Sequence, residues 1–552
     1  MRGAPPATSK LVLAAAGAAA VASLLWRVAV EPVDFGYVRY LAIADEMARS
    51  GDWVVMRLVD DVYVHKPPLF FWLMAPIIAA LGEAPGWVAH VPDLLALALS
   101  LVCVHRLGAA IFGTGEPALA SALVFATTWE SFNQATGKRL DFVFAALLTA
   151  AFTSFYLGAG SREQRRPRQR LLALAFVALG LATLTKGPLA ILLFGIVTLP
   201  WAAASGRLRV FAARGTLAGV ALLFVVCAAW PSLLVARLGV DGSLSALRAT
   251  DLASRTGDLL LYARSLPVLQ LPWSLFFPAL GVWLWRSRPS RSSDGVRFLV
   301  VWVVAILAVL HVPEARHQRY LQPVTPALSL LVTGLWYAPT GAPAGSSELA
   351  DRLLRGAYAA CLVVLCFAGS LAGLGLLLFA REQFYGTPLP PERWLAGPVA
   401  LATGASAAAL LAGLRRHRPA RTSPLLLATV LLGALTTANL LTVGDLRRMD
   451  STPLARAALA PARSARPVGL LGMHEEQRQM GRLLTRRTLP LLPDAAAAAA
   501  WARQQGRDCA LLLTDGAGRR SLLREVGLAV RSLRDFELAQ EPVELIELCP
   551  DS

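Results

Sequence analysis

Four cationic side chains stand beside apolar segments of the sequence: Lys66, Arg139, Lys186 and Arg319. A charge at membrane depth is costly, so a set of such charges favours a functional explanation. In a water-poor site, cations hold phosphate oxygens more strongly than in bulk water, and arginine can bind two oxygens at once. These four residues are therefore our candidates for binding a phosphate.

Two carboxylates, Asp34 and Asp141, are candidates for orienting a bound substrate or accepting a proton from it. Asp141 also begins an apolar run, so a role as a helix N-cap is an equal alternative. The alternative for Lys66 is a lysine that extends toward the membrane interface. We favour phosphate contact for Lys66 because Tyr63 precedes it and the rigid pair Pro67-Pro68 follows it.

Aromatic and imidazole side chains accompany these charges, and we expect Tyr63, His65, His317 and Tyr320 to contact the substrate. The short basic and aromatic turn at 316–320 suits a head-group site, although it could also be a solvated loop. His65 is a possible ligand of a divalent metal such as Zn²⁺. The sequence has no cysteine spacing typical of a metal site and no Walker, Rossmann or Gly-x-Ser-x-Gly motif, so no cofactor is assigned with certainty.

The composition is that of a polytopic α-helical membrane protein. Of 552 residues, 56% are hydrophobic and 16% are charged, and the mean hydropathy is +0.54. These values exclude a soluble cytoplasmic enzyme and a disordered chain. The net charge of +17 comes from arginines that lie between apolar runs, so it indicates membrane topology rather than nucleic-acid binding.

Apolar runs long enough to cross a bilayer predict about thirteen transmembrane helices. Their approximate ranges are 11–30, 88–105, 116–134, 141–159, 171–184, 188–204, 214–236, 274–286, 297–311, 321–337, 356–380, 394–414 and 424–443. The stretch 68–82 is short for a crossing, and we expect it to lie at the outer interface or to dip into the membrane. The first run could be mistaken for a signal peptide, but we interpret it as an anchor.

Arginine-rich loops alternate with mixed loops, which fixes the expected orientation. The basic loops should face the cytoplasm, and the loops 31–87, 237–273, 311–320 and 381–393 should face outward. In the first outer loop, Tyr40, Ile43 and Met47 recur at helical spacing, which predicts an amphipathic helix on the outer leaflet. Residues 1–443 would thus form the membrane domain of a multi-pass protein.

Residues 444–552 have a different character, and we expect a small extracytoplasmic α/β domain. Short β-like runs at 467–472, 508–514, 527–532 and 542–548 alternate with helical patterns at 475–485, 494–505 and 519–526. Cys509 and Cys549 lie on two of these strands and could pair in an oxidising compartment. Two unpaired buried thiols are an equal alternative. Cys103, Cys227, Cys361 and Cys366 fall in predicted spans, where they would be small apolar fillers.

An ordered set of motifs resembles the aminoarabinose transferase of lipid A and its relatives in the protein O-mannosyltransferase superfamily. The set contains Arg39-Tyr40, Glu46-Met47, Ser50-Gly51-Asp52-Trp53, Tyr63, Lys66-Pro67-Pro68-Leu69, Arg139-Leu140-Asp141, Leu184-Thr185-Lys186-Gly187-Pro188, Pro272-Trp273-Ser274, Arg319-Tyr320-Leu321-Gln322-Pro323 and Pro326-Ala327-Leu328. The resemblance covers roughly residues 30–340. It implies the GT-C fold and a polyprenyl-phosphate-linked sugar donor.

Two positions depart from the pattern of that family. Gly36 and Tyr37 occupy the places of its usual Asp-Glu pair, and His65 occupies the place of a Glu before the lysine. Asp34 would have to substitute for the missing acid. With His65 in place of that Glu, the site offers one carboxylate fewer to a metal, although an imidazole can still ligate Zn²⁺.

We therefore expect an integral membrane glycosyltransferase that moves a sugar from a polyprenyl phosphate to an extracytoplasmic lipid, glycan or protein, as in lipid A modification or protein glycosylation. One alternative, suggested by the missing acidic pair, is a relative that binds lipid-linked sugars without transfer. The other is a transporter of lipid-linked sugars. Against transport stand the long outer loops and the lack of a clear repeat in the two halves.

Overall fold

The computed structural model describes most of the chain. The described residues are 7–30, 35–58, 61–137, 140–160, 167–248, 258, 260–287, 294–313, 316–337, 348–378, 391–416, 424–449, 467–472, 489–505, 509–514, 528–538 and 541–550. Contacts divide the chain into two compact units. Unit 1 contains Met1–Val28 and Pro92–Gly444, and unit 2 contains Ala29–Val91 and Asp445–Ser552.

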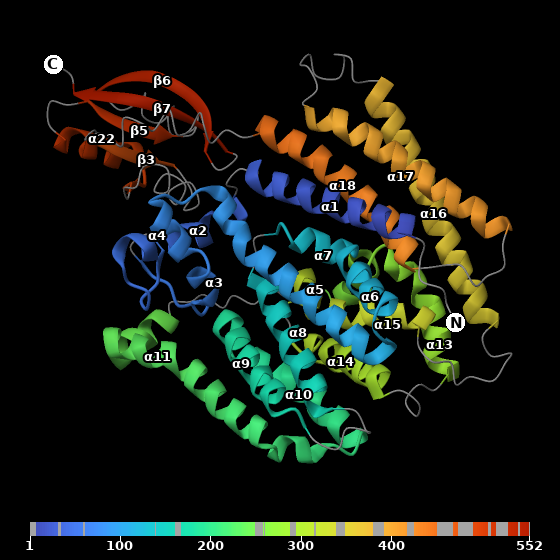
Figure 1. Ribbon diagram of the computed structural model, residues 1–552. Helices are drawn as coiled ribbons and strands as arrows, with labels where there is room; N and C mark the ends of the chain where they lie inside the picture. Colours follow the sequence, from blue (N-terminus) through green and yellow to red (C-terminus); the bar gives the residue numbers. More distant parts are fainter. Residues whose placement is uncertain are drawn as a thin grey trace. The chain divides into compact units, whose positions relative to one another are not determined.

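Within the described residues, eight helical segments are long and apolar enough to cross a membrane, or nine if a bent pair counts as one span. They lie on α1 (Ala7–Val30), α5 (Val91–Phe112), α8 (Leu140–Ala159), α9 (Gln169–Lys186), α11 (Arg214–Arg248), α16 (Glu348–Leu378), α17 (Pro391–Arg416) and α18 (Pro424–Met449). These eight agree with eight of the thirteen predicted spans. The structure is that of a polytopic helical membrane protein (Figure 1).

The other five predicted spans are helical but shorter or broken, so their crossing stays a prediction. The segment 116–134 divides into α6 (Glu116–Ala126) and α7 (Trp129–Gln134). The segment 188–204 is α10 (Leu189–Ala204), and 297–311 is α14 (Asp294–Leu310). The segment 274–286 is η3 (Trp273–Phe276) with α13 (Phe277–Ser287), which follows α12 (Leu261–Leu269) across a 105° bend. The segment 321–337 is η4 (Gln318–Val324) with α15 (Thr325–Tyr337).

Helix α8 is the centre of unit 1, because it packs against α9, α10 and η4 and most of its side chains are buried. Aromatic rings from three helices meet around it. The ring centroid of Phe152 lies 5.7 Å from that of Phe194 on α10 and 4.4 Å from that of Trp302 on α14. Burying such large rings is a main source of packing energy, so these contacts hold α8, α10 and α14 together.

Small residues let neighbouring helices approach closely. Helix α9 packs against both α8 and α11 (Figure 1). A Cβ atom added at Gly219 on α11 would lie 2.9 Å from Cβ of Phe176 on α9. Helices α16 and α17 likewise pack along their lengths, through Gly369 and Gly404. Close helix pairs of this kind are typical of membrane proteins.

The first loop, in unit 2, folds into short helices around a buried face. It contains α2 (Phe35–Ser50), β1 (Arg57–Leu58), β2 (Asp61–Val62), α3 (Leu69–Trp72), α4 (Ala75–Leu81) and η1 (Gly86–His90). The predicted helix over this loop is confirmed, but its apolar face is covered within the protein, and its place at the outer leaflet stays a prediction. Ile43 and Met47 are buried, and α2 packs against α3, α4 and η1. Protein rather than lipid therefore covers the apolar face.

The C-terminal part of unit 2 forms a five-stranded mixed sheet in the order β4-β3-β5-β7-β6. Its strands are β3 (Val468–Leu471), β4 (Leu491–Leu492), β5 (Ala510–Thr514), β6 (Leu528–Leu538) and β7 (Glu541–Pro550). Strands β3, β4 and β5 are parallel, and β5, β7 and β6 are antiparallel. Helix α22 (Ala495–Gln504) covers one face through a core that includes Ala498, Leu512 and Ile546.

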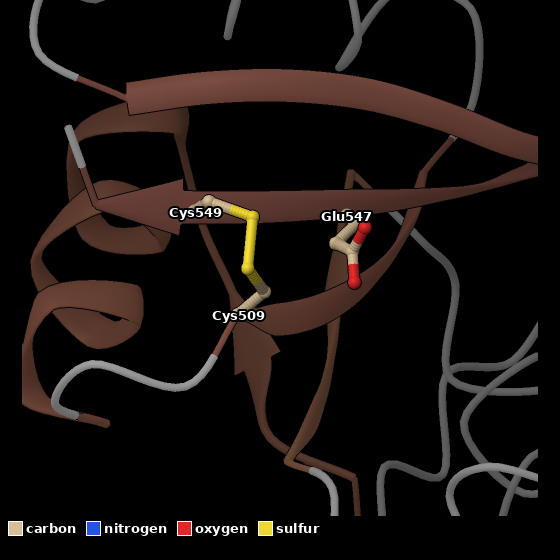
Figure 2. A group of neighbouring side chains, drawn as sticks. All are labelled: Cys509, Glu547 and Cys549. Carbon is tan, nitrogen blue, oxygen red and sulfur yellow. A yellow bond between two sulfur atoms is a disulfide. The ribbon is translucent and has the colours of Figure 1, made fainter. Parts of the chain in front are cut away.

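The four predicted strands and the helix at 494–505 are confirmed, whereas β4 was missed. The predicted helices 475–485 and 519–526 lie outside the described residues. A disulfide joins Cys509 to Cys549 across β5 and β7 (Figure 2). Of the two alternatives for these cysteines, the structure thus has the pair and not the two free thiols. Cys103, Cys227, Cys361 and Cys366 are free, and they lie on α5, α11 and α16.

Candidate functional site

Asp141, Lys186 and Arg319 meet in unit 1. Lys186 Nζ forms an ion pair and a hydrogen bond with Asp141 Oδ1. Arg319 Nε lies 3.4 Å from Asp141 Oδ2. The three residues come from the start of α8, the end of α9 and η4. One carboxylate is therefore shared by two cations.

The ends of α8 and α9 explain why Asp141 and Lys186 meet. The two helices pack as an antiparallel pair, so the first turn of one lies beside the last turn of the other. An acidic group suits the N-terminus of a helix and a basic group suits the C-terminus. Helix α9 stops after Lys186 because Gly187 has φ +89°, and Pro188 then leads into α10.

Aromatic rings surround the ammonium group of Lys186. Lys186 Nζ lies 4.2 Å from the ring centroid of Tyr320 and 5.4 Å from that of Phe144. The ring of His317 meets Tyr320 edge-on at 5.2 Å, and the Arg319 guanidinium carbon lies 5.7 Å from the Tyr320 centroid. Cation–π contacts of this kind add to the ion pair where water is scarce.

Exposure distinguishes the two cations. The side chains of Asp141 and Lys186 are 7% and 12% exposed, whereas that of Arg319 is 37% exposed. Arg319 Nε is itself buried and, among the described residues, makes no hydrogen bond, since its contact with Asp141 is an ion pair of longer range. Arg319 therefore retains donors for a further anionic group, whereas Lys186 is largely enclosed.

Two hydrogen bonds that the sequence did not predict hold η4 and the first residue of α15 in place. Trp302 Nε1 on α14 donates to the carbonyl oxygen of Pro323 at 2.9 Å. Gln270 Nε2, which follows α12, donates to Thr325 Oγ1 at 2.9 Å. Trp302, Gln270 and Thr325 are buried. The only signal in the sequence was the set of polar and tryptophan residues within apolar runs, which does not identify partners.

Tyr63, His65 and Lys66 lie in unit 2, in the first loop. Tyr63 is buried, and its ring lies 5.2 Å from that of His65 and 5.8 Å from that of Phe71. Burial raises the pKa of the Tyr63 phenol, so this group stays neutral. Burial, followed by the charges of Arg39 and Lys66, lowers the pKa of the His65 imidazole. Lys66 is half-buried directly before Pro67.

Asp34 and Arg139 lie outside the described residues, so their expected roles stay predictions. The described residues also gather no set of three metal-ligating side chains around His65. They do gather Cys509, Glu547 and Cys549, whose ligand atoms lie within 4.8 Å of one another (Figure 2). Since the two sulfurs are bonded to each other, they do not offer thiolates to a metal. We derive no step through a metal.

Comparison with known proteins agrees with this architecture. A family model for dolichyl-phosphate-mannose-protein mannosyltransferase matches residues 65–232. The fold is similar to that of the crystal structure of ArnT from Cupriavidus metallidurans in the apo state, with a TM-score of 0.74, 19% identity and 98% of each chain covered. The structure of that protein bound to undecaprenyl phosphate gives a TM-score of 0.69 at 18% identity, again with 98% coverage of each chain.

The similarity to these structures shows that this membrane protein has the GT-C fold. A curated relative from Pseudomonas paraeruginosa, undecaprenyl phosphate-alpha-4-amino-4-deoxy-L-arabinose arabinosyl transferase, is 30% identical over 407 residues, which span 72% of this chain and 70% of that protein. The chain belongs to the family of these arabinosyl transferases. The expected fold class and enzyme class are thereby confirmed.

Proposed function

We propose that the protein transfers a 4-amino-4-deoxy-L-arabinose residue from undecaprenyl phosphate to a lipid acceptor on the outward face of the membrane. The family relationship supports this donor, because the name of the relative includes undecaprenyl phosphate-alpha-4-amino-4-deoxy-L-arabinose. The observation that carries the proposal is the cluster of Arg319, Lys186 and Asp141, which presents a partly exposed guanidinium at the ends of two membrane helices.

The chemistry of the reaction matches such a cluster. An oxygen of the acceptor attacks the anomeric carbon, and the bond from that carbon to the phosphate oxygen breaks. The bonding electrons leave with the lipid phosphate, whose negative charge increases by one. A cation near that oxygen in a water-poor site lowers the barrier, and Arg319 is placed to supply it. Lys66 and Arg139 are further proposed cations for the same phosphate.

The attacking group requires a base if it carries a proton. Both oxygens of Asp141 already face cations, so they are poorly placed to accept that proton. Asp34 is the proposed base. Tyr63, His65, His317 and Tyr320 are proposed to line the sugar and head-group region, and Tyr320 already packs against both cations of the cluster.

The orientation follows from the charge of the loops. Arginine-rich loops favour the cytoplasmic side, which would place the Asp141 end of α8 and the C-terminal sheet outside. The disulfide between Cys509 and Cys549 supports this orientation, since such bonds persist in oxidising compartments. An alkaline phosphatase fused after Ser552 should therefore be active in the bacterial host.

The transfer itself is tested with purified protein in proteoliposomes. Labelled undecaprenyl phosphate-aminoarabinose is supplied with lipid A, with a glycan or with a peptide, and the products are identified by mass spectrometry. We expect product on the lipid alone, and loss of that product with Arg319→Ala or Lys66→Ala. Binding of undecaprenyl phosphate without turnover on any acceptor would favour the alternative of a non-catalytic relative, which the Gly36-Tyr37 departure motivates.

A further inference from the structure

The cluster at the start of α8 contains two cations with unequal surroundings. Lys186 is enclosed by Asp141, Tyr320 and Phe144, and 12% of its side chain is exposed. Arg319 touches the same carboxylate only through a 3.4 Å ion pair, and 37% of its side chain is exposed. An enclosed ammonium group that already has a carboxylate and two ring faces has little capacity left for a phosphate.

We propose that Lys186 is a positioning residue, which neutralises Asp141 so that Arg319 remains free to bind the donor phosphate. The inference rests on the proposed function and deepens it, because it divides the cluster into a contacting residue and a supporting pair. Asp141 then acts as the counter-ion that orients both cations and takes no part in proton transfer.

Electrostatics gives the reason. A buried carboxylate without a partner is unfavourable, so it attracts whichever cation remains nearby. If Lys186 were uncharged, both oxygens of Asp141 would be open to Arg319, which lies beside Oδ2 already. A guanidinium can bind both oxygens of one carboxylate in a two-pronged arrangement. Arg319 would then be held by Asp141, and its affinity for phosphate would fall although Arg319 itself is unchanged.

This mechanism predicts a suppressor. Lys186→Met removes the charge and keeps a long flexible side chain. Its binding of undecaprenyl phosphate in detergent micelles, measured through tryptophan fluorescence, should weaken about tenfold, the effect of one charge-assisted hydrogen bond. The double variant Lys186→Met/Asp141→Asn no longer has a carboxylate to capture Arg319. Its affinity should return to within about threefold of wild type, a difference below one such bond.

Turnover separates the roles further. In Lys186→Met the donor KM should rise more than kcat falls, and Lys186→Arg should restore the KM because it keeps the charge. A double variant that binds as weakly as Lys186→Met would overturn the proposal, since Lys186 would then contact the phosphate itself. A double variant that binds normally but does not turn over would also overturn it, because Asp141 would then take part in the chemistry.

A matched control comes from the other end of α8. Arg207 pairs with Asp294 at 2.9 Å, and their side chains are 12% and 20% exposed. Arg207 also donates to the carbonyl oxygen of Gly160, just past the end of α8, which is about 30 Å from Asp141 along a helix of this length. Arg207→Met breaks a similar pair but should leave the affinity of the folded protein for undecaprenyl phosphate unchanged.

Binding by the wild-type protein distinguishes failure of the proposed function from failure of this inference. If wild-type protein does not bind undecaprenyl phosphate, the proposed function fails and this inference fails with it. If wild type binds and Lys186→Met loses affinity without recovery in the double variant, the inference alone fails. Thermal unfolding of each variant confirms that binding is compared between folded proteins. If Lys186→Met does not fold, Lys186→Gln, alone and combined with Asp141→Asn, takes its place in the same comparison.

Discussion

The indole N–H of Trp302 donates to the carbonyl oxygen of Pro323 at 2.9 Å, which ties the middle of α14 to η4. Arg319 lies on the same short 3-10 helix, four residues before Pro323. A 3-10 helix has poorer hydrogen-bond geometry than an α-helix, so it depends more on bonds from neighbouring elements. The position of the Arg319 guanidinium beside Asp141 thus depends on Trp302. Among the described residues, Trp302 makes no hydrogen bond with Arg319 or Asp141.

Replacing Trp302 with Phe should test this support. The change keeps a ring next to Phe152 and removes the donor, which leaves the buried Pro323 carbonyl without this bond. A buried acceptor that loses its partner costs about 1–3 kcal/mol, so thermal unfolding should occur at a lower temperature. The donor KM should also rise, because η4 carries Arg319. Trp201→Phe, which removes a 3.3 Å bond to the Asp294 carbonyl, is the control and should lower stability without raising that KM.

The Arg207–Asp294 pair should matter for stability rather than for donor binding. It joins the turn that follows α10 to the start of α14, and Ser205 Oγ donates to the same carboxylate at 2.5 Å. Removing one partner of a largely buried pair costs about 3–5 kcal/mol. Arg207→Met should therefore lower the thermal unfolding temperature substantially in detergent. Equal stability of Arg207→Met and wild type would show that the pair contributes little.

Close approach of α16 and α17 gives a second test of stability. A Cβ atom at Gly404 would lie 2.8 Å from the backbone nitrogen of Ser370 and 3.1 Å from the carbonyl oxygen of Cys366. Backbone atoms cannot move aside as a side chain can, so Gly404→Ala should push the helices apart and cost about 1–3 kcal/mol. Gly281→Ala is the control, since no atom lies within 4 Å of its added Cβ. The comparison uses unfolding temperatures in the same detergent.

The first loop should respond to pH through His65. Burial and the charges of Arg39 and Lys66 lower its pKa in the folded protein. The unfolded chain then binds more protons in the range below the ordinary pKa of about 6.5, so stability falls as the pH falls through the lowered folded value. After division by the intrinsic exchange rate at each pH, the protection of the backbone amides around Tyr63 should fall as the pH falls below about 6.5. His65→Gln should remove this dependence, and a slope that persists in the variant would assign it to another group.

Much of this fold could be predicted because apolar length and arginine position act locally. Eight predicted spans agree with helices that are long enough to cross a membrane. The break between α6 and α7 was missed because hydropathy does not register it. There, Thr127 Oγ1 and Thr128 Oγ1 donate back to the carbonyl oxygens of Leu123 and Val124, at 2.6 and 2.8 Å. Threonine can satisfy the backbone in this way where a helix ends.

The site was predictable in part for a similar reason. Asp141 and Lys186 were recognised by charge at the ends of apolar runs, and consecutive antiparallel helices bring such ends together. That Asp141 would be shared between two cations was not predicted, because Arg319 reaches it from a segment 178 residues away. The bonds from Trp302 and Gln270 depend on packing between non-consecutive helices, which the sequence pattern does not reveal.

The disulfide between Cys509 and Cys549 should stabilise the C-terminal sheet. It closes a segment of 40 residues between the start of β5 and the end of β7. By loop-closure entropy, a crosslink of this length contributes about 4 kcal/mol. In Cys509→Ala/Cys549→Ala, residues 467–550 should therefore be cut by trypsin at a lower protease concentration than in wild type. The double replacement avoids a leftover thiol.

A maleimide gel-shift before and after reduction should show that two of the six cysteines of wild type become reactive only when a reductant is added. Equal labelling without reductant would show that the bond does not form in the cell.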